Sequence, residues 1–245
     1  MVWYMNGRPF LLILPLIGLL FQSCSESPCL KSTGEESTQW RTVPEYHRLS
    51  LSDGFDYVLL NDSSTEIKLE GGENLLSFVS LEVKQGQLEV KDDNTCRFLR
   101  NNRKRIKVYI PARKVNFLFY NGYGQLSTAD TLPMDQLSID IKETGDLRLS
   151  LHARRLTILH RGFGDVYLAG KAENLNMTYE NFCRTEAQEM VCDTLYVNTN
   201  SFADGFFFSE QSADILLRSK GNLYLRGPAM NLRLRQEGQG QLIRQ

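Results

Sequence analysis

The residues best suited to bind a charged partner lie in one basic segment. Its members are Arg97, Arg100, Arg103, Lys104, Arg105, Lys107, Arg113 and Lys114. Arginine forks match phosphate and carboxylate groups, so the segment could bind phosphate, lipid head groups or acidic polysaccharide. The alternative is a solvated loop followed by the outward side of a strand. Our candidate binding residues here are Arg100, Arg103, Lys104, Arg105 and Lys107.

Aromatic clusters beside glycine turns are the second candidate for binding. One is Phe206–Phe208, and the other is Phe117, Phe119 and Tyr120 with Tyr123. Strand alternation places Phe207 outside if its two neighbours are core residues, or the reverse. An exposed ring could stack on a sugar or on a protein partner. Phe207 and Tyr123 are therefore candidates, against the alternative that the rings stack within a core.

Residues that could perform catalysis or bind metal do not gather in the sequence. Acidic residues stand singly at predicted turns, and general acid–base chemistry needs convergent groups; they are Asp146, Asp165, Asp204 and Asp214. The sequence has no Gly-x-Ser-x-Gly motif and no Cys-x-x-Cys pair, and its three histidines are scattered. We therefore expect no enzyme, no catalytic residue, no metal and no cofactor. Asp146 and Asp165 are expected to cap their turns.

The first residues predict export and a lipid anchor. Phe10 to Phe21 is an apolar run of 12 residues, too short to span a bilayer, and it is typical of a signal peptide. It ends at Ser23-Cys24, which resembles a lipobox. We predict a lipoprotein signal peptide at residues 1–23, lipid attachment at Cys24 and a Ser/Thr/Glu-rich tether at 24–42. The alternative is an ordinary signal peptide with an incidental cysteine.

The cysteine count agrees with an exported protein. Five cysteines are odd, and lipid on one leaves four in an oxidising compartment. Four cysteines allow three pairings. We favour Cys183–Cys192 and Cys29–Cys96.

Charge excludes one class of partner. The 245-residue chain has a formal net charge of −1. A near-neutral balance argues against nucleic acid as a partner.

A glycine-marked turn recurs about every twenty residues in the second half of the chain. Its second glycines are Gly124, Gly145, Gly164, Gly205, Gly221 and Gly240. Short strands of period two lie between the turns, for example at Leu137, Ile139 and Ile141. Such a repeat predicts an all-β, right-handed β-helix (β-solenoid) over residues 43–245, of about ten coils and almost no helix. The alternative is a β-sandwich. Arg97–Arg105 is the one stretch in which we expect a helical turn.

Four further motifs carry a family resemblance. They are Pro28-Cys29 with Thr33-Gly34, Glu73-Asn74-Leu75-Leu76, Asp93-Asn94-Thr95-Cys96 with Arg100, and the serial Gly-x-Gly turns. They resemble the "head GIN" domain of bacterial lipoproteins described as auto-transporter adhesin heads. The resemblance implies a β-helical fold at the cell envelope and brings no established activity. The chain departs from the pattern at Cys183–Cys192 and at Phe206–Phe208.

These observations predict a binding protein of the bacterial cell envelope. We expect a lipid-anchored adhesion module at the outer membrane, facing the periplasm or the surface, which presents a β-helical face to a glycan or protein partner. Two alternatives are a structural or regulatory envelope protein that contacts a membrane partner and, less favoured, a polysaccharide-active enzyme.

Overall fold

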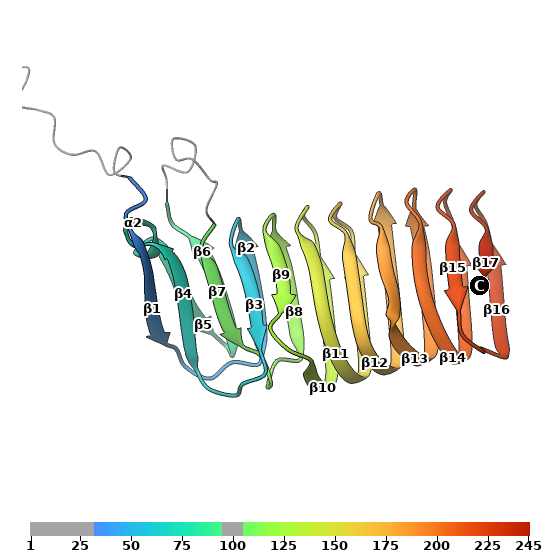
Figure 1. Ribbon diagram of the computed structural model, residues 1–245, viewed down its shortest axis with the longest axis horizontal. Helices are drawn as coiled ribbons and strands as arrows, with labels where there is room; N and C mark the ends of the chain where they lie inside the picture. Colours follow the sequence, from blue (N-terminus) through green and yellow to red (C-terminus); the bar gives the residue numbers. More distant parts are fainter. Residues whose placement is uncertain (1–31, 95–104) are drawn as a thin grey trace, which may run out of the picture.

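The computed structural model describes residues 32–94 and 105–245 and shows a β-solenoid of about seven turns (Figure 1). Its described strands join in one 17-stranded sheet. The strands are β1 (Glu36–Thr42), β2 (Arg48–Asp53), β3 (Asp56–Leu60), β4 (Glu66–Gly72), β5 (Val79–Lys84), β6 (Gln87–Asp92), β7 (Lys107–Pro111), β8 (Phe117–Gly122), β9 (Gln125–Thr128), β10 (Leu132–Ile141), β11 (Asp146–His160), β12 (Val166–Asn181), β13 (Thr185–Ser201), β14 (Gly205–Leu217), β15 (Leu223–Arg226), β16 (Asn231–Gln236) and β17 (Leu242–Arg244). The solenoid prediction is confirmed.

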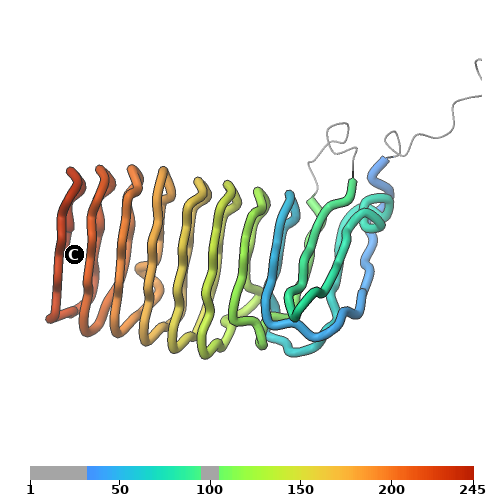
Figure 2. Tube along the Cα trace, turned by 180° about the vertical axis from the view of Figure 1, so that it is seen from behind, coloured from blue at the N-terminus to red at the C-terminus, as the bar shows by residue number. Residues whose placement is uncertain are grey.

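Parallel pairing between successive coils sets the repeat. Leu147 pairs with Val166, Val166 with Thr185, and Thr185 with Gly205, so these coils take 19, 19 and 20 residues. Each long strand bends once, and its two parts lie on opposite sides of the core. The glycine corners join the two sides along one edge, the upper edge in Figures 1 and 2.

The solenoid has two broad faces, which we name by their outward side chains. The stripe face consists of β1, β4, β7, β3 and β9, the first parts of β11 to β14, and β15 and β17. The polar face consists of β6, β2 and β8, the second parts of β10 to β14, and β16.

The N-terminal third breaks the sequential order of the coils. β2 lies between β6 and β8, and β3 lies between β7 and β9, so this early coil is inserted between two later ones. β4 then pairs antiparallel with both β1 and β7, and β5 pairs antiparallel with β6. This antiparallel group covers one end of the stack, as capping segments of solenoids do.

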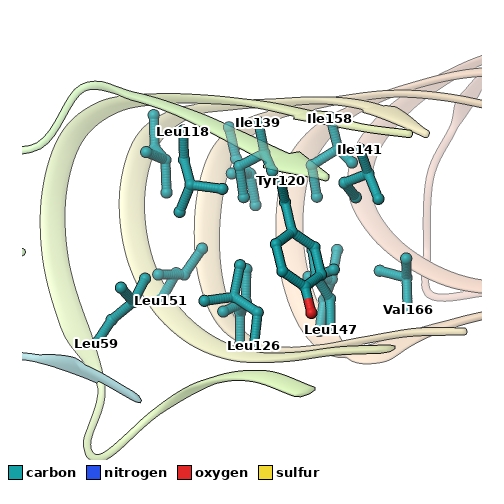
Figure 3. Packing of buried hydrophobic residues seen from close by; sticks show 14 of the residues in the cluster. Leu59, Leu118, Tyr120, Leu126, Ile139, Ile141, Leu147, Leu151, Ile158 and Val166 are labelled. Carbon is teal, nitrogen blue, oxygen red and sulfur yellow. The ribbon is translucent and has the colours of Figure 1, made fainter. Parts of the chain in front are cut away.

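Columns of aliphatic side chains fill the interior. Two facing rows line it in Figure 3, with Leu118, Ile139 and Ile158 opposite Leu126 and Leu147. The Tyr120 ring spans the space between the rows, and its hydroxyl donates to the Gly124 carbonyl at 2.7 Å. The described core runs from Val43 to Leu225. A chain that begins at Ser25 therefore keeps every residue of this core.

Three expectations need correction. The tether was predicted to extend to residue 42, but β1 is paired with β4 over Glu36–Thr42, so the folded body begins earlier. The described helical turn is α2 (Glu73–Leu76), whereas the stretch predicted to turn lies mostly in residues 95–104, outside the described part. The solenoid has about seven turns instead of about ten, because the N-terminal residues form the antiparallel cap.

Candidate functional site

One outward column of side chains crosses every layer of the stripe face. From the capped end onward it contains Trp40, Lys68, Tyr109, Val58, Ser127, Arg148, Tyr167, Glu186, Phe206, Tyr224 and Ile243. We call this column the stripe. Because neighbouring strands lie about 4.8 Å apart, side chains in one column stack on each other. Most members of the stripe are aromatic or charged, and Val58, Ser127 and Ile243 are the exceptions.

At the capped end, a lysine lies between two aromatic rings. Lys68 Nζ is 4.5 Å from the Tyr109 ring centroid and 5.9 Å from that of Trp40. Glu70 pairs with Lys68 Nζ at 2.5 Å and accepts the Tyr109 hydroxyl at 2.6 Å. These bonds lower the pKa of Glu70, and the same carboxylate raises the pKa of Tyr109 to about 12. The cation here is already neutralised.

In the middle of the stripe, an arginine stacks on a tyrosine. The Arg148 guanidinium carbon lies 3.8 Å from the Tyr167 ring centroid. In the next coil, Glu186 accepts from Arg184 Nε at 2.7 Å and from Gln188 Nε2 at 2.8 Å. The bond from Gln188, followed by that from Arg184, lowers the pKa of Glu186. Its carboxylate is thus ionised and held in place.

Two aromatic rings close the far end of the stripe. Phe206 and Tyr224 stack with ring centroids 4.7 Å apart and planes 8° from parallel. Arg184 lies over the Phe206 ring at 4.6 Å. The two broad sides of Phe206 are occupied by these contacts, so its edge is what it offers to a ligand.

A shallow depression of about 330 Å³ lies beside the stripe. Its lining includes the small residues Ser150 and Ala169 together with the larger Arg148, Tyr167 and Glu186. A second depression of about 170 Å³ is lined by Glu186, Gln188, Phe206, Phe207, Tyr224, Arg226 and Gln245. The two depressions share Glu186 and Gln188, so they are neighbours along the stripe, and we call them together the groove.

A bulge in β13 shapes the point where the depressions meet. Ala187 pairs with Phe207 and Val191 with Phe208, so β13 carries three residues more than β14 between these pairs. Gln188 begins the bulge. Its Oε1 is buried and has no hydrogen-bond partner among the described residues. A buried acceptor without a partner costs free energy.

Of the two predicted aromatic binding residues, one is exposed and the other is buried. Tyr123 is exposed at its corner, with a relative accessibility of 43 %. Phe207 was a candidate for an exposed ring, and this is wrong because Phe207 is fully buried. Its column points inward, since it pairs with Ala187 and Leu225, and the outward ring is Phe206. Alternation left both choices open, and pairing decided between them.

The described part of the basic segment does not form one cluster. Arg105 is 3.4 Å from Asp56, and Lys114 is 2.9 Å from Glu45. Lys107 is exposed at the start of β7, at the other end from Lys114. Arg100, Arg103 and Lys104 lie outside the described residues, as do Cys24, Cys29 and Cys96.

The favoured Cys183–Cys192 disulfide is absent, and both residues are buried free thiols. Nine residues separate them in a coil of about 19, so they lie about half a coil apart. Cys183 Sγ is 3.8 Å from Thr185 Oγ1, and Cys192 Sγ donates to the Phe208 carbonyl at 2.9 Å. Burial raises the pKa of each thiol to about 12.

The corner aspartates bond to backbone amides of the next coil, whereas Asp146 and Asp165 are expected to cap their own turns. Asp146 accepts the amide of Asp165 at 2.9 Å, and Asp165 accepts that of Arg184 at 3.1 Å. Asp204 likewise accepts the amide of Asn222 at 2.9 Å. These carboxylates fasten each corner to the next. Nowhere in the described residues do three His, Cys, Asp or Glu side chains gather as a metal site requires.

Comparison with known proteins identifies the family. The family described as "Putative auto-transporter adhesin, head GIN domain" matches residues 45–229. The chain belongs to this family. The head GIN resemblance read from the sequence is thereby confirmed. No curated protein matches the chain. Within residues 32–94 and 105–245, the structure contains no helix that is long and apolar enough to cross a membrane.

Solved structures share the fold at low sequence identity. A putative adhesin from Bacteroides fragilis has a TM-score of 0.80 at 20 % identity, covering 86 % of this chain and 97 % of its own. A protein from Parabacteroides distasonis, described as a putative lipid binding protein, has a TM-score of 0.66 at 14 % identity, covering 87 % and 98 %. A putative adhesin from the same species has a TM-score of 0.65 at 14 % identity, covering 86 % and 98 %. At these identities the likeness concerns the fold.

Sequence reasoning missed the stripe, although a signal for it is present. Three central members stand three residues after the second glycine of their corner, namely Arg148 after Gly145, Tyr167 after Gly164 and Tyr224 after Gly221. Aligning these coils on that glycine places the three residues in one column. The same spacing from Gly205 leads to Phe208 instead of the stripe residue Phe206, so strand pairing is needed to complete the column.

Proposed function

We propose that this protein is a lipid-anchored binding module of the bacterial cell envelope that uses the stripe to hold a linear glycan. Membership of an adhesin-like family suggests adhesion and a location at the envelope or surface. Lipid attachment at Cys24 rests on the lipobox-like Ser23-Cys24.

The observation that carries the proposal is the groove beside Tyr167. It combines the Tyr167 ring, the Arg148 donors and the Glu186 acceptor on one sheet. Sugars present apolar C–H faces and many hydroxyls, so they suit a site that mixes aromatic and polar groups. The groove follows the solenoid axis, which fits an extended chain better than a compact ligand.

Charge favours a neutral glycan over an acidic one. Lys68 is paired with Glu70 and Arg184 with Glu186, while the Arg148 guanidinium stacks on Tyr167. Binding should therefore depend little on salt. Strongly salt-dependent binding to acidic glycans would instead favour the basic segment that contains Arg103 and Arg105.

The test is a glycan and envelope-polysaccharide array probed with the chain from Ser25 at two salt concentrations. Tyr167→Ala should weaken the binding of any captured neutral glycan about tenfold or more, since a tyrosine at the centre of a binding site commonly carries much of the binding energy. Tyr196→Ala is the matched control, because Tyr196 is an exposed tyrosine on the polar face. Equal loss in both variants, or unchanged binding in Tyr167→Ala, contradicts the proposal. An array without any binding would favour a protein partner in the envelope.

A further inference from the structure

Three exposed phenylalanines line the glycine-corner edge. Phe163, Phe182 and Phe202 occupy equivalent corner positions in successive coils and are 55, 63 and 52 % exposed. Phe182 and Phe202 stack with centroids 5.2 Å apart. We call these three residues the phenylalanine ridge. Single exposed apolar residues are common, but three adjacent large ones mark an interaction surface.

Corner packing leaves Phe163 at the tip of its coil. A Cβ added at Gly162 would lie 1.9 Å from the Glu143 carbonyl oxygen, and one at Gly164 would lie 2.2 Å from that of Gly145. In this coil the corner backbone is therefore stacked too closely for side chains at the two inner positions, whereas the next two coils have Asn181 and Cys183, and Ser201 and Ala203, at these positions. The residue between the two glycines is left at the tip, and in this coil it is Phe163. The ridge is thus convex, unlike the groove on the stripe face.

We infer that the phenylalanine ridge inserts into the head-group region of a lipid bilayer and lays the solenoid along the membrane. The chain enters the described structure at the same edge, where Ser32 precedes β1 (Figures 1 and 2). Eight residues separate Cys24 from Ser32, a reach of at most roughly 28 Å. This placement of the corner edge near the bilayer rests on the proposed lipid anchor at Cys24. An anchored chain would hold its corner edge close to the bilayer.

The charges beside the ridge are consistent with an apolar contact. Arg161 binds Asp140 with two bonds of 2.7 Å, and Arg184 binds Glu186. With these cations paired, insertion of the rings supplies the affinity, as for side chains of interfacial proteins. A lipid anchor on a tether leaves the orientation of the solenoid free, and the ridge would fix it. The stripe face would then stand upright from the membrane, open to a ligand.

The test uses flotation with vesicles of phosphatidylethanolamine and phosphatidylglycerol. The chain from Ser25 keeps the whole core and lacks Cys24, so a covalent lipid cannot hide the contribution of the ridge. The variants are Phe163→Ser/Phe182→Ser/Phe202→Ser and, as control, Tyr196→Ser on the polar face. We expect the parent and control to float equally at low and high salt. The triple variant should lose about tenfold or more in partitioning, because it loses three partly buried rings.

Three outcomes would overturn the inference. One is a parent chain that does not float, and another is a triple variant that floats as well as the parent. The third is a parent that is dimeric in solution while the triple variant is monomeric, which would make the ridge a protein contact. Far-UV circular dichroism and the melting temperature must match between variants. Metabolic labelling of the full chain with a fatty acid, with and without Cys24→Ala, tests the anchor separately.

Discussion

The two broad faces share one core but differ outside it. On the polar face the outward column corresponding to the stripe is Phe117, Ser138, Thr157, Asn176, Tyr196, Asp214 and Arg233. Its middle consists of small polar side chains, whereas the middle of the stripe has Arg148, Tyr167 and Glu186. Inward columns on both faces are mainly aliphatic, because both enclose the same interior. The middle of the polar face therefore shows that these coils fold without large stacked side chains outside, although Arg48 lies over Phe117 nearer the capped end.

The largest expected effect comes from comparing an inward and an outward phenylalanine on the stripe face. Phe207→Ala should destabilise the protein by about 3–5 kcal/mol, because a buried phenylalanine leaves a cavity. Phe206→Ala should cost about 1 kcal/mol, since it removes an aromatic stack at the surface. Urea unfolding of both variants provides the measurement. Similar losses would mean that the stripe belongs to the core.

The inward side of the polar face contains a buried histidine. Neither ring nitrogen of His160 has a partner among the described residues, and burial lowers its pKa to about 4 from 6.5. The folded state favours the neutral imidazole, whereas the unfolded chain takes up a proton below pH 6.5. The free energy of unfolding therefore does not depend on this group above pH 6.5, and it falls by roughly 3 kcal/mol as the pH decreases toward 4.

Replacing that histidine should remove this acid sensitivity. His160→Met should be about as stable at pH 4 as at pH 7 with respect to this group, and more stable than the parent at pH 4. Unfolding free energies at several pH values test this, with exposed His152→Met as control. An unchanged pH profile in His160→Met would show that the imidazole is not buried in solution.

A substitution at the corners that join the two faces should cause an intermediate loss of stability. Asp165→Ala removes the acceptor for the Arg184 amide and should cost about 1.5–3 kcal/mol, as expected for a bond to a charged group. Asp130→Ala is the control, because Asp130 is an exposed aspartate outside these corners. Thermal unfolding compares the two. Equal melting temperatures would exclude a structural role for the corner carboxylate.

The smallest effect is expected for the ion pair beside the stripe. A double-mutant cycle on Arg184→Ala and Glu186→Ala should give a coupling of about 0.5 kcal/mol, since both groups are partly exposed. The same variants should change ligand binding more than stability if the pair positions groups in the groove. A coupling of several kcal/mol would instead make the pair part of the structural frame.

Local patterns in the sequence were sufficient to predict a solenoid of short strands. Alternation with period two showed which residues could share a face, as at Leu137, Ile139 and Ile141. The glycine corners and their aspartates showed where the chain turns, since close stacking at the corner excludes a Cβ. Gln85 and Gly86, which join β5 to β6, both have positive φ, as a two-residue hairpin turn requires. These features depend on neighbouring residues, so they are visible without a structure.

Contacts between distant segments were decided by the tertiary structure. Only pairing shows that β2 and β3 lie between later strands, that Phe207 points inward, and that Cys183 and Cys192 are separated. The bulge of β13 and the stripe also arise from registers between coils about 19 residues apart. A single strand of period two is compatible with either side facing inward. Stacking against the adjacent coils selects one side, and that selection creates the binding surface.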